Sequence, residues 1–183
     1  MDLRDVQIAT PRLILRPLRV EDFDAWAALM ADPQAAQFIG GQQARALAWR
    51  GFMCMAGAWH LTGVGMFSVL EKDGGRWVGR VGPWRPHGWP GPEIGWAIIR
   101  ERWGRGYATE AAAASIDFAL DTLGWDEVIH CIAPDNSMSQ AVARKLGSRH
   151  RGVGRMPPPH DQAEIEIWGQ SRTEWRAAQR RSV

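Results

Sequence analysis

Apolar and polar residues alternate with two different periods along this chain, and each period predicts a kind of element. Alternation every second residue, or a short apolar run, predicts strands at residues 12–18, 93–99, 127–133 and 163–169. Two further strands flank the turn KDGG within residues 63–82, a pattern typical of a β-hairpin.

Apolar residues at helical spacing predict helices over residues 20–32, 42–60, 107–125 and 136–147. Asn136 stands at the expected N-cap of the last one, and Gly147 follows its end. Three prolines in residues 84–92 exclude regular structure there. Strands and helices in this order predict one mixed α/β domain over residues 1–183.

Composition changes this picture little. Of 183 residues, 45% are hydrophobic and 23% charged, and the net charge is +2, so no global field favours nucleic acid or a membrane surface. Cys54 and Cys131 are too few for a disulfide framework or a zinc site, and we expect no metal. The N-terminus has no apolar signal segment, so we expect a cytoplasmic protein.

The segment RWGRGYATE, residues 102–110, has the pattern of an anion site. A strand precedes it, two glycines expose its backbone, and a helix follows, whose N-terminus presents free N–H groups and the positive end of its dipole. A Walker A loop is excluded because the required Lys is missing. A dinucleotide fingerprint is strained, because Thr109 replaces its third glycine.

WGRGYATEA resembles the pyrophosphate motif of the GNAT superfamily of N-acetyltransferases, in the form found in the branch of ribosomal-protein alanine acetyltransferases. Trp103 stands where the superfamily pattern has Gln or Arg. The segments TPRLILRPLRVEDFDAW, WPGPEIGWAI and APDNSMSQAVARKLGS match that family in order, with Ser148 where Phe is usual. The resemblance covers residues 10–170.

The resemblance implies a mostly antiparallel central sheet of six to seven strands, splayed in the middle and flanked by four helices. It implies acetyl-CoA as donor, with its pyrophosphate on the turn and its pantetheine along the strand before it. The residues implied in donor binding are Trp96, Ala97, Ile98, Trp103, Gly104, Arg105, Gly106, Tyr107, Ala108, Thr109 and Asn136. Arg102 is a further candidate for phosphate contact.

Direct transfer to an amine needs a base and an acid. Many family members use a tyrosine seven residues after the asparagine as the acid, but that position is Ala143 here, which leaves Ser139 as the candidate. Glu93 is the preferred base. Glu164, Glu166 and His130 are alternatives, although a lone histidine in a strand is more often structural.

The acceptor is expected to be a primary amine, either a small molecule or a peptide N-terminus, in a groove formed by the first two helices, the proline-rich loop and the last strands. Those segments offer Trp49, Trp59, Trp84, Arg85, His87, Trp89 and His160. A non-catalytic CoA-binding module is the alternative from another functional class. Whether the chain forms a homodimer is left open.

Overall fold

One sheet runs through the computed structural model, which describes residues 5–158, 160–162 and 164–180. Its eight strands lie in the order β1-β2-β3-β4-β5-β6-β8-β7. They are β1 (Ile8–Ala9), β2 (Leu13–Arg16), β3 (Phe67–Glu71), β4 (Trp77–Trp84), β5 (Glu93–Ile98), β6 (Glu127–Ile132), β7 (Arg149–Arg155) and β8 (Glu164–Ser171). Neighbouring strands are antiparallel, except that β5 and β6 are parallel.

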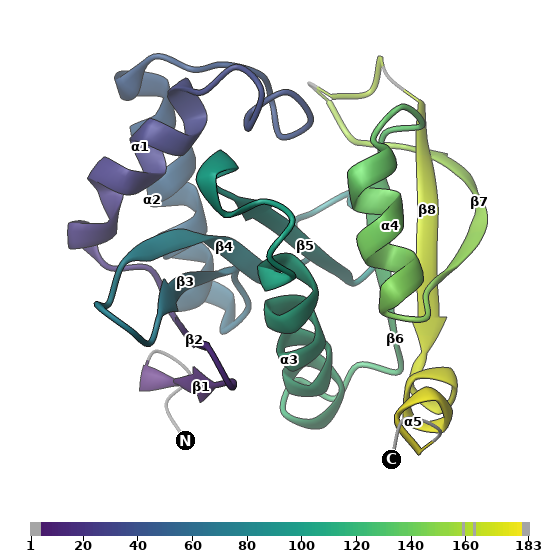
Figure 1. The fold of residues 1–183 in the computed structure, drawn as a ribbon. Coiled ribbons are helices and arrows are strands. Elements are labelled where there is room, and N and C mark those ends of the chain that lie inside the picture. Colours follow the sequence, from purple (N-terminus) through teal and green to yellow (C-terminus); the bar gives the residue numbers. More distant parts are fainter. Residues whose placement is uncertain (1–4, 159, 163, 181–183) are drawn as a thin grey trace.

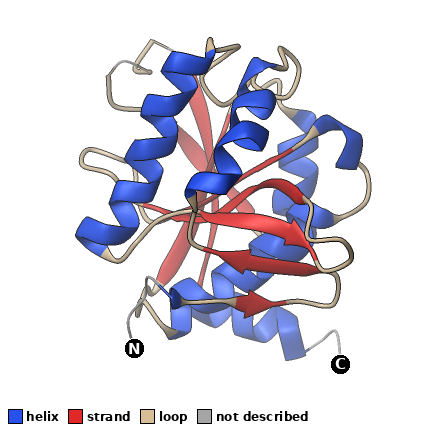
Figure 2. Cartoon of the chain, turned by 90° about the vertical axis from the view of Figure 1, so that its left-hand side faces the viewer, coloured by secondary structure: helices blue, strands red, loops and turns tan. Residues whose placement is uncertain are grey.

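Helices lie on both sides of this sheet (Figure 2). They are α1 (Phe23–Ala31), α2 (Arg45–Thr62), α3 (Tyr107–Asp121), α4 (Ser137–Lys145) and α5 (Arg172–Arg180), with the short 3₁₀ helices η2 (Val20–Asp22) and η3 (Arg100–Arg102). α3 packs on β4 and β5, α4 on β6, and α5 on β8 (Figure 1).

The hydrophobic core lies on both faces of the sheet, because side chains along each strand point alternately to one face and the other. Ala97 packs with Trp26 and Phe52 of α1 and α2, whereas the next residue, Ile98, packs with α3 residues such as Ile116. Because successive side chains of a strand point to opposite faces, β5 separates an α1–α2 side from an α3 side.

The sheet opens between β5 and β6. The two strands are paired only at Glu93 and Ile129, and the Ile129 N–H donates to the Pro92 carbonyl at 2.9 Å. Beyond Glu93 the edge of β5 that faces β6 is no longer paired with it as a ladder. An open strand edge of this kind can accept an extended ligand.

The predicted elements are confirmed, with shifts at their ends. The KDGG turn joins β3 to β4, with Gly74 and Gly75 at φ values of 75° and 63°. The predicted last strand is described from Glu164 onward, because Ala163 lies outside the described residues.

Three elements were not predicted, namely β1, β7 and α5. The described part of the chain therefore has eight strands and five α-helices, whereas six to seven strands and four helices were expected. β7 has no apolar face: six of its seven residues are Arg, His or Gly, and none is buried. α5 buries only Trp175. β7 therefore has no alternating apolar pattern, and the short, highly charged α5 offers a single large apolar residue as its signal.

Candidate active site

The glycine turn between η3 and α3 leaves a helix N-terminus open. Gly104 and Gly106 have φ values of 72° and 79°, a left-handed conformation that favours glycine. Gly106 is the N-cap of the 15-residue helix α3, and no side chain caps the helix there. The N–H groups of the first turn are therefore available to an anion, at the positive end of the helix dipole.

Arg12 fixes this turn from the start of the sheet. Its Nε lies 2.6 Å from Glu110 Oε2 and its Nη1 donates to the carbonyl oxygen of Arg105 at 2.9 Å. Glu110 also accepts from the Thr10 hydroxyl at 2.6 Å. The turn is thus held by residues that lie about a hundred positions away in the chain.

Of the two arginines in the turn, only Arg102 has an ion-pair partner among the described residues. Its Nε and Nη2 donate to the two Glu71 carboxylate oxygens at 2.8 and 3.0 Å. The Tyr107 hydroxyl donates to the same carboxylate at 2.8 Å. Arg102 and Tyr107 therefore brace the turn against β3, and the exposed Arg105 is the arginine left to meet an anion.

Trp103 follows η3, and its side chain contacts the end of β5. Its indole N–H donates to the Ile98 carbonyl at 2.7 Å, and its ring packs against the α3 core. The Gln or Arg usual in the superfamily could not fill this apolar position in the same way. This hydrogen bond also occupies the Ile98 carbonyl, which a ligand lying along the strand could otherwise use as an acceptor.

Glu93 is a buried carboxyl at the point where the sheet opens. Oε2 accepts from the Trp89 indole N–H at 2.6 Å, and Oε1 accepts from the Cys131 backbone N–H at 3.1 Å. Burial raises the pKa of Glu93 to about 7, although these hydrogen bonds and Arg80 favour its charged form. A carboxyl with this pKa exchanges protons readily at neutral pH.

Ser139 and Asn136 meet at the start of α4. The Asn136 side chain accepts from the Ser139 N–H at 3.0 Å, which confirms Asn136 as the N-cap. The Trp96 indole N–H donates to Ser139 Oγ at 3.1 Å. That bond polarises the hydroxyl and leaves its proton free to be donated elsewhere.

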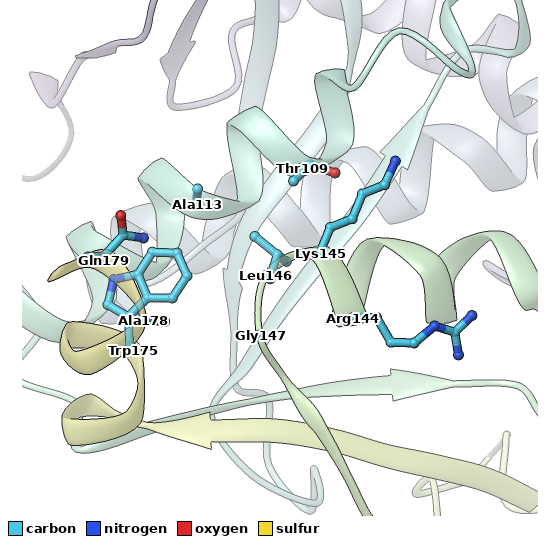
Figure 3. A pocket seen from close by; sticks show the side chains of 9 residues that line it. All are labelled: Thr109, Ala113, Arg144, Lys145, Leu146, Gly147, Trp175, Ala178 and Gln179. Carbon is cyan, nitrogen blue, oxygen red and sulfur yellow. The ribbon is translucent and has the colours of Figure 1, made fainter. Parts of the chain in front are cut away.

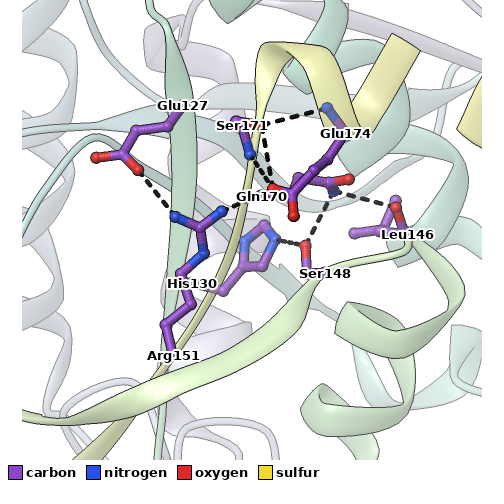
Figure 4. A network of polar contacts seen from close by, with 8 residues as sticks. All are labelled: Glu127, His130, Leu146, Ser148, Arg151, Gln170, Ser171 and Glu174. Atoms are coloured by element: carbon purple, nitrogen blue, oxygen red, sulfur yellow. Dashed lines mark hydrogen bonds and ion pairs between the residues drawn. The ribbon is translucent and has the colours of Figure 1, made fainter. Parts of the chain in front are cut away.

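His130 is a structural residue in this fold. It is buried, its Nδ1 lies 2.8 Å from the Ile94 carbonyl, and its Nε2 lies 2.9 Å from Ser148 Oγ (Figure 4). Because a carbonyl can only accept, Nδ1 carries the proton and Nε2 accepts from Ser148. Burial lowers the pKa of His130 to about 4, so it stays neutral.

The same network accounts for Ser148, which stands where the family usually has Phe. Gln170 Nε2 donates to Ser148 Oγ at 2.9 Å and to the Leu146 carbonyl at 3.0 Å (Figure 4). Ser148 therefore joins β6, β8 and the end of α4, and a phenyl ring could not replace these bonds.

The two alternative glutamate bases differ in their surroundings. Glu166 accepts from Gln140 and from Trp168, whereas Glu164 is exposed. Burial raises the pKa of the Cys131 thiol, which keeps it protonated and unreactive.

Among the residues proposed for an acceptor groove, Trp59 is excluded. It is 3% exposed, packs with Phe67, and donates to the Met66 carbonyl at 2.7 Å, so it belongs to the core. Trp84 and Trp89 lie edge to face with centroids 6.5 Å apart. Arg85, His87 and His160 are exposed, and Trp49 stacks on Phe52.

Arg80 is a buried cation that the sequence did not single out. It lies on β4, 8% exposed, with its guanidinium 5.0 Å from the ring centre of Trp26 and its Nη1 2.6 Å from Met66 Sδ. The only available signal was a charge among alternating residues of a strand, in VGRVG.

A hollow lies beside the glycine turn, between α3, the end of α4 and α5 (Figure 3). Thr109, Lys145 and Trp175 line it. This adds a second cation near the N-terminus of α3.

Two absences hold for the described residues. They contain no group of three His, Cys, Asp or Glu side chains that could hold a metal ion. Their helices are also too short or too polar to cross a bilayer.

An opened sheet with a glycine turn at a helix N-terminus defines the chain as a protein of the acetyltransferase fold. It belongs to the GNAT family, because the Acetyltransferase (GNAT) domain matches residues 12–149. The family predicted from the sequence is therefore confirmed, and the chain is an acetyltransferase.

Two curated relatives are similar over different lengths. YkkB of Bacillus subtilis (strain 168) is 32% identical over 90 residues, which cover 48% of this chain and 52% of YkkB. The N-acetyltransferase p20 of Bacillus licheniformis is 26% identical over 149 residues, 80% of this chain and 84% of p20.

Solved structures share the fold over nearly the whole chain. An acetyltransferase from Agrobacterium tumefaciens str. C58 has a TM-score of 0.79 at 30% identity, covering 91% of this chain and 95% of that one. A candidate ribosomal-protein-serine acetyltransferase from Vibrio cholerae has a TM-score of 0.76 at 20% identity, covering 92% of this chain and 98% of that one. The second agrees in fold with the ribosomal-protein branch that the sequence resembles.

Proposed function

We propose that this protein is an N-acetyltransferase that moves the acetyl group of acetyl-CoA directly to a primary amine. The observation that carries the proposal is Glu93, a buried carboxyl with a pKa of about 7 at the opening of the sheet. Family membership supports the acetyl donor, and the amine acceptor rests on the chemistry of the site.

In this proposal the amine acceptor and the acetyl-CoA donor approach β5 from opposite faces of the sheet. Glu93 lies on the same face as Ala97, which packs against α1 and α2, while Trp96 lies on the other face and bonds Ser139 of α4. The amine therefore reaches Glu93 from the α1–α2 side. The donor lies between β5 and α4, with its pyrophosphate on the N–H groups that follow Gly104 and Gly106 and its charge balanced by Arg105.

The proposed roles follow from these positions. Acetyl-CoA supplies the acetyl group as a thioester and leaves as the free thiol. Glu93 takes a proton from the ammonium, so that the neutral nitrogen can attack the carbonyl carbon; the C–N bond forms as the C–S bond breaks. Ser139 gives its proton to the departing sulfur and regains one, through water, from the acylated nitrogen. One proton of the original ammonium is released to solvent.

The test is the release of CoA thiol with a mixed panel of amines and peptide N-termini, with CoA binding titrated in parallel. Amine-dependent thiol release together with binding is the expected result. Binding with no turnover on any amine would favour the non-catalytic CoA-binding module. Absence of binding would contradict both functions.

A further inference from the structure

Two buried hydrogen-bond donors lie next to each other without an acceptor. Of the buried side-chain nitrogens and oxygens that the structure describes, three have no partner, and two of them are Arg80 Nε and Trp26 Nε1. The Arg80 guanidinium lies over the Trp26 ring, 5.0 Å from its centre. Buried donors without acceptors are costly, and a pair of them in one place indicates a missing acceptor.

Arg80 is also a poorly compensated charge. Among the described residues, the one hydrogen-bond acceptor of its side chain is the Met66 thioether, which accepts weakly. Glu93 is within electrostatic reach, because each residue favours the charged form of the other, but no hydrogen bond joins them. A buried guanidinium ordinarily needs an anion bonded directly to it.

The space between Arg80 and Glu93 contains no bulky strand residue. On β4 and β5, Arg80 pairs with Ala97 and Trp84 with Glu93, and the pair between them is Gly82 with Gly95. Met66 covers Gly95: a Cβ there would come within 2.5 Å of Met66 Cε. Unbranched methionine side chains move at low cost, so Met66 can give way to a small ligand.

We propose that the acceptor is a small amine that carries a carboxylate, with its amine at Glu93 and its carboxylate at Arg80 and Trp26. A planar carboxylate matches the fork of a guanidinium, and it would accept from both unpartnered donors. The burial of Trp26, Arg80 and Glu93 favours an amino acid over a longer chain. This inference rests on the proposed acetyl transfer and names its acceptor class.

The test compares each amino acid with its own amide: glycine with glycinamide, β-alanine with its amide, and γ-aminobutyrate with its amide. The expected preference in kcat/KM for the carboxylate is about 10- to 100-fold for at least one pair, the range for a charge-assisted bond. Because Arg80 also favours the charged form of Glu93, Arg80→Met should slow turnover of both members of each pair, but it should reduce the carboxylate preference to near unity. Arg80→Lys should restore part of it, and Trp26→Phe should reduce it less. Arg50→Met, at an exposed position of α2, is the matched control.

Thermal stability with CoA and each ligand gives a second readout that needs no turnover. Stabilisation by the carboxylate that disappears in Arg80→Met supports the site even if no amine is acetylated, in which case the acetyl-transfer proposal fails alone. Turnover with no carboxylate preference, or with one that Arg80→Met leaves unchanged, overturns this inference and leaves the acetyl transfer standing. A preference confined to peptides that begin with Asp over Asn would also overturn it, because the occupant would then be a peptide.

Discussion

The Glu93 carboxylate on β5 accepts a hydrogen bond from the backbone N–H of Cys131 on β6, at 3.1 Å. This contact spans the two parallel strands where their ladder stops, so a side chain replaces a backbone bond. The candidate base is therefore built into the opening of the sheet. Its surroundings set both its proton affinity and its position.

The buried carboxyl has a consequence for stability. The unfolded chain releases the Glu93 proton near pH 4.5, whereas the folded chain holds it to about pH 7. Between these values the native state binds more protons, so the free energy of unfolding falls as pH rises from 4.5 to 7 and then levels off. Urea unfolding measures this decrease in the wild type and in Glu93→Gln. Across the range, the free energy of unfolding should decrease by on the order of 3 kcal/mol more in the wild type. Parallel curves for the two proteins would show that Glu93 keeps an ordinary pKa.

Ser139 should affect turnover more than donor binding. Ser139→Ala removes the proton that we assign to the departing sulfur, and kcat should fall by about 10²-fold with the Kd for CoA unchanged. Trp96→Phe removes only the bond that polarises the hydroxyl, so its effect should be smaller. An unchanged kcat in Ser139→Ala would assign the acid to another group or to water.

Gly106 should control donor binding through charge as well as shape. Glutamate and glutamine at this position suffer the same backbone strain at φ 79°, but only glutamate adds a negative charge beside the pyrophosphate. Calorimetric titration with CoA should therefore show weaker binding for Gly106→Glu than for Gly106→Gln. Equal affinities would place the pyrophosphate elsewhere.

Ser148 should matter for folding. Ser148→Ala leaves His130 Nε2 buried without its donor and removes one acceptor of Gln170, which should cost about 1–3 kcal/mol in urea unfolding. Ser137→Ala, at an exposed position of α4, serves as control and should stay within about 0.5 kcal/mol of the wild type. Equal stabilities of the two variants would refute the structural role of the network.

Periodic burial made much of the fold predictable. The β3–β4 hairpin and α3 each bury a regular apolar set, and the hairpin has its turn at Gly74. α4 buries only Ala143, and its Asn136 cap made it predictable. β7 and α5 were missed because Arg, His and Gly dominate the first and Trp175 alone anchors the second.

The site was predictable where function depends on local backbone and not where it depends on contacts between distant segments. The turn at Gly104 and Gly106 and the Asn136 cap are local. Three other features depend on contacts between distant segments. Arg102 is paired with Glu71, His130 is buried and bonded to Ser148, and Arg80 lies on the same face of the sheet as Glu93.

The central claim is that Glu93 is the base, and the pH dependence of amine-dependent thiol release tests it most directly. For the wild type, kcat/KM should rise with pH through an apparent pKa of about 7. Two acceptors with different amine pKa values separate this inflection from titration of the substrate. Glu93→Gln should lower the rate by about 10²- to 10⁴-fold and abolish the inflection. A variant that keeps both the rate and the inflection would contradict the account.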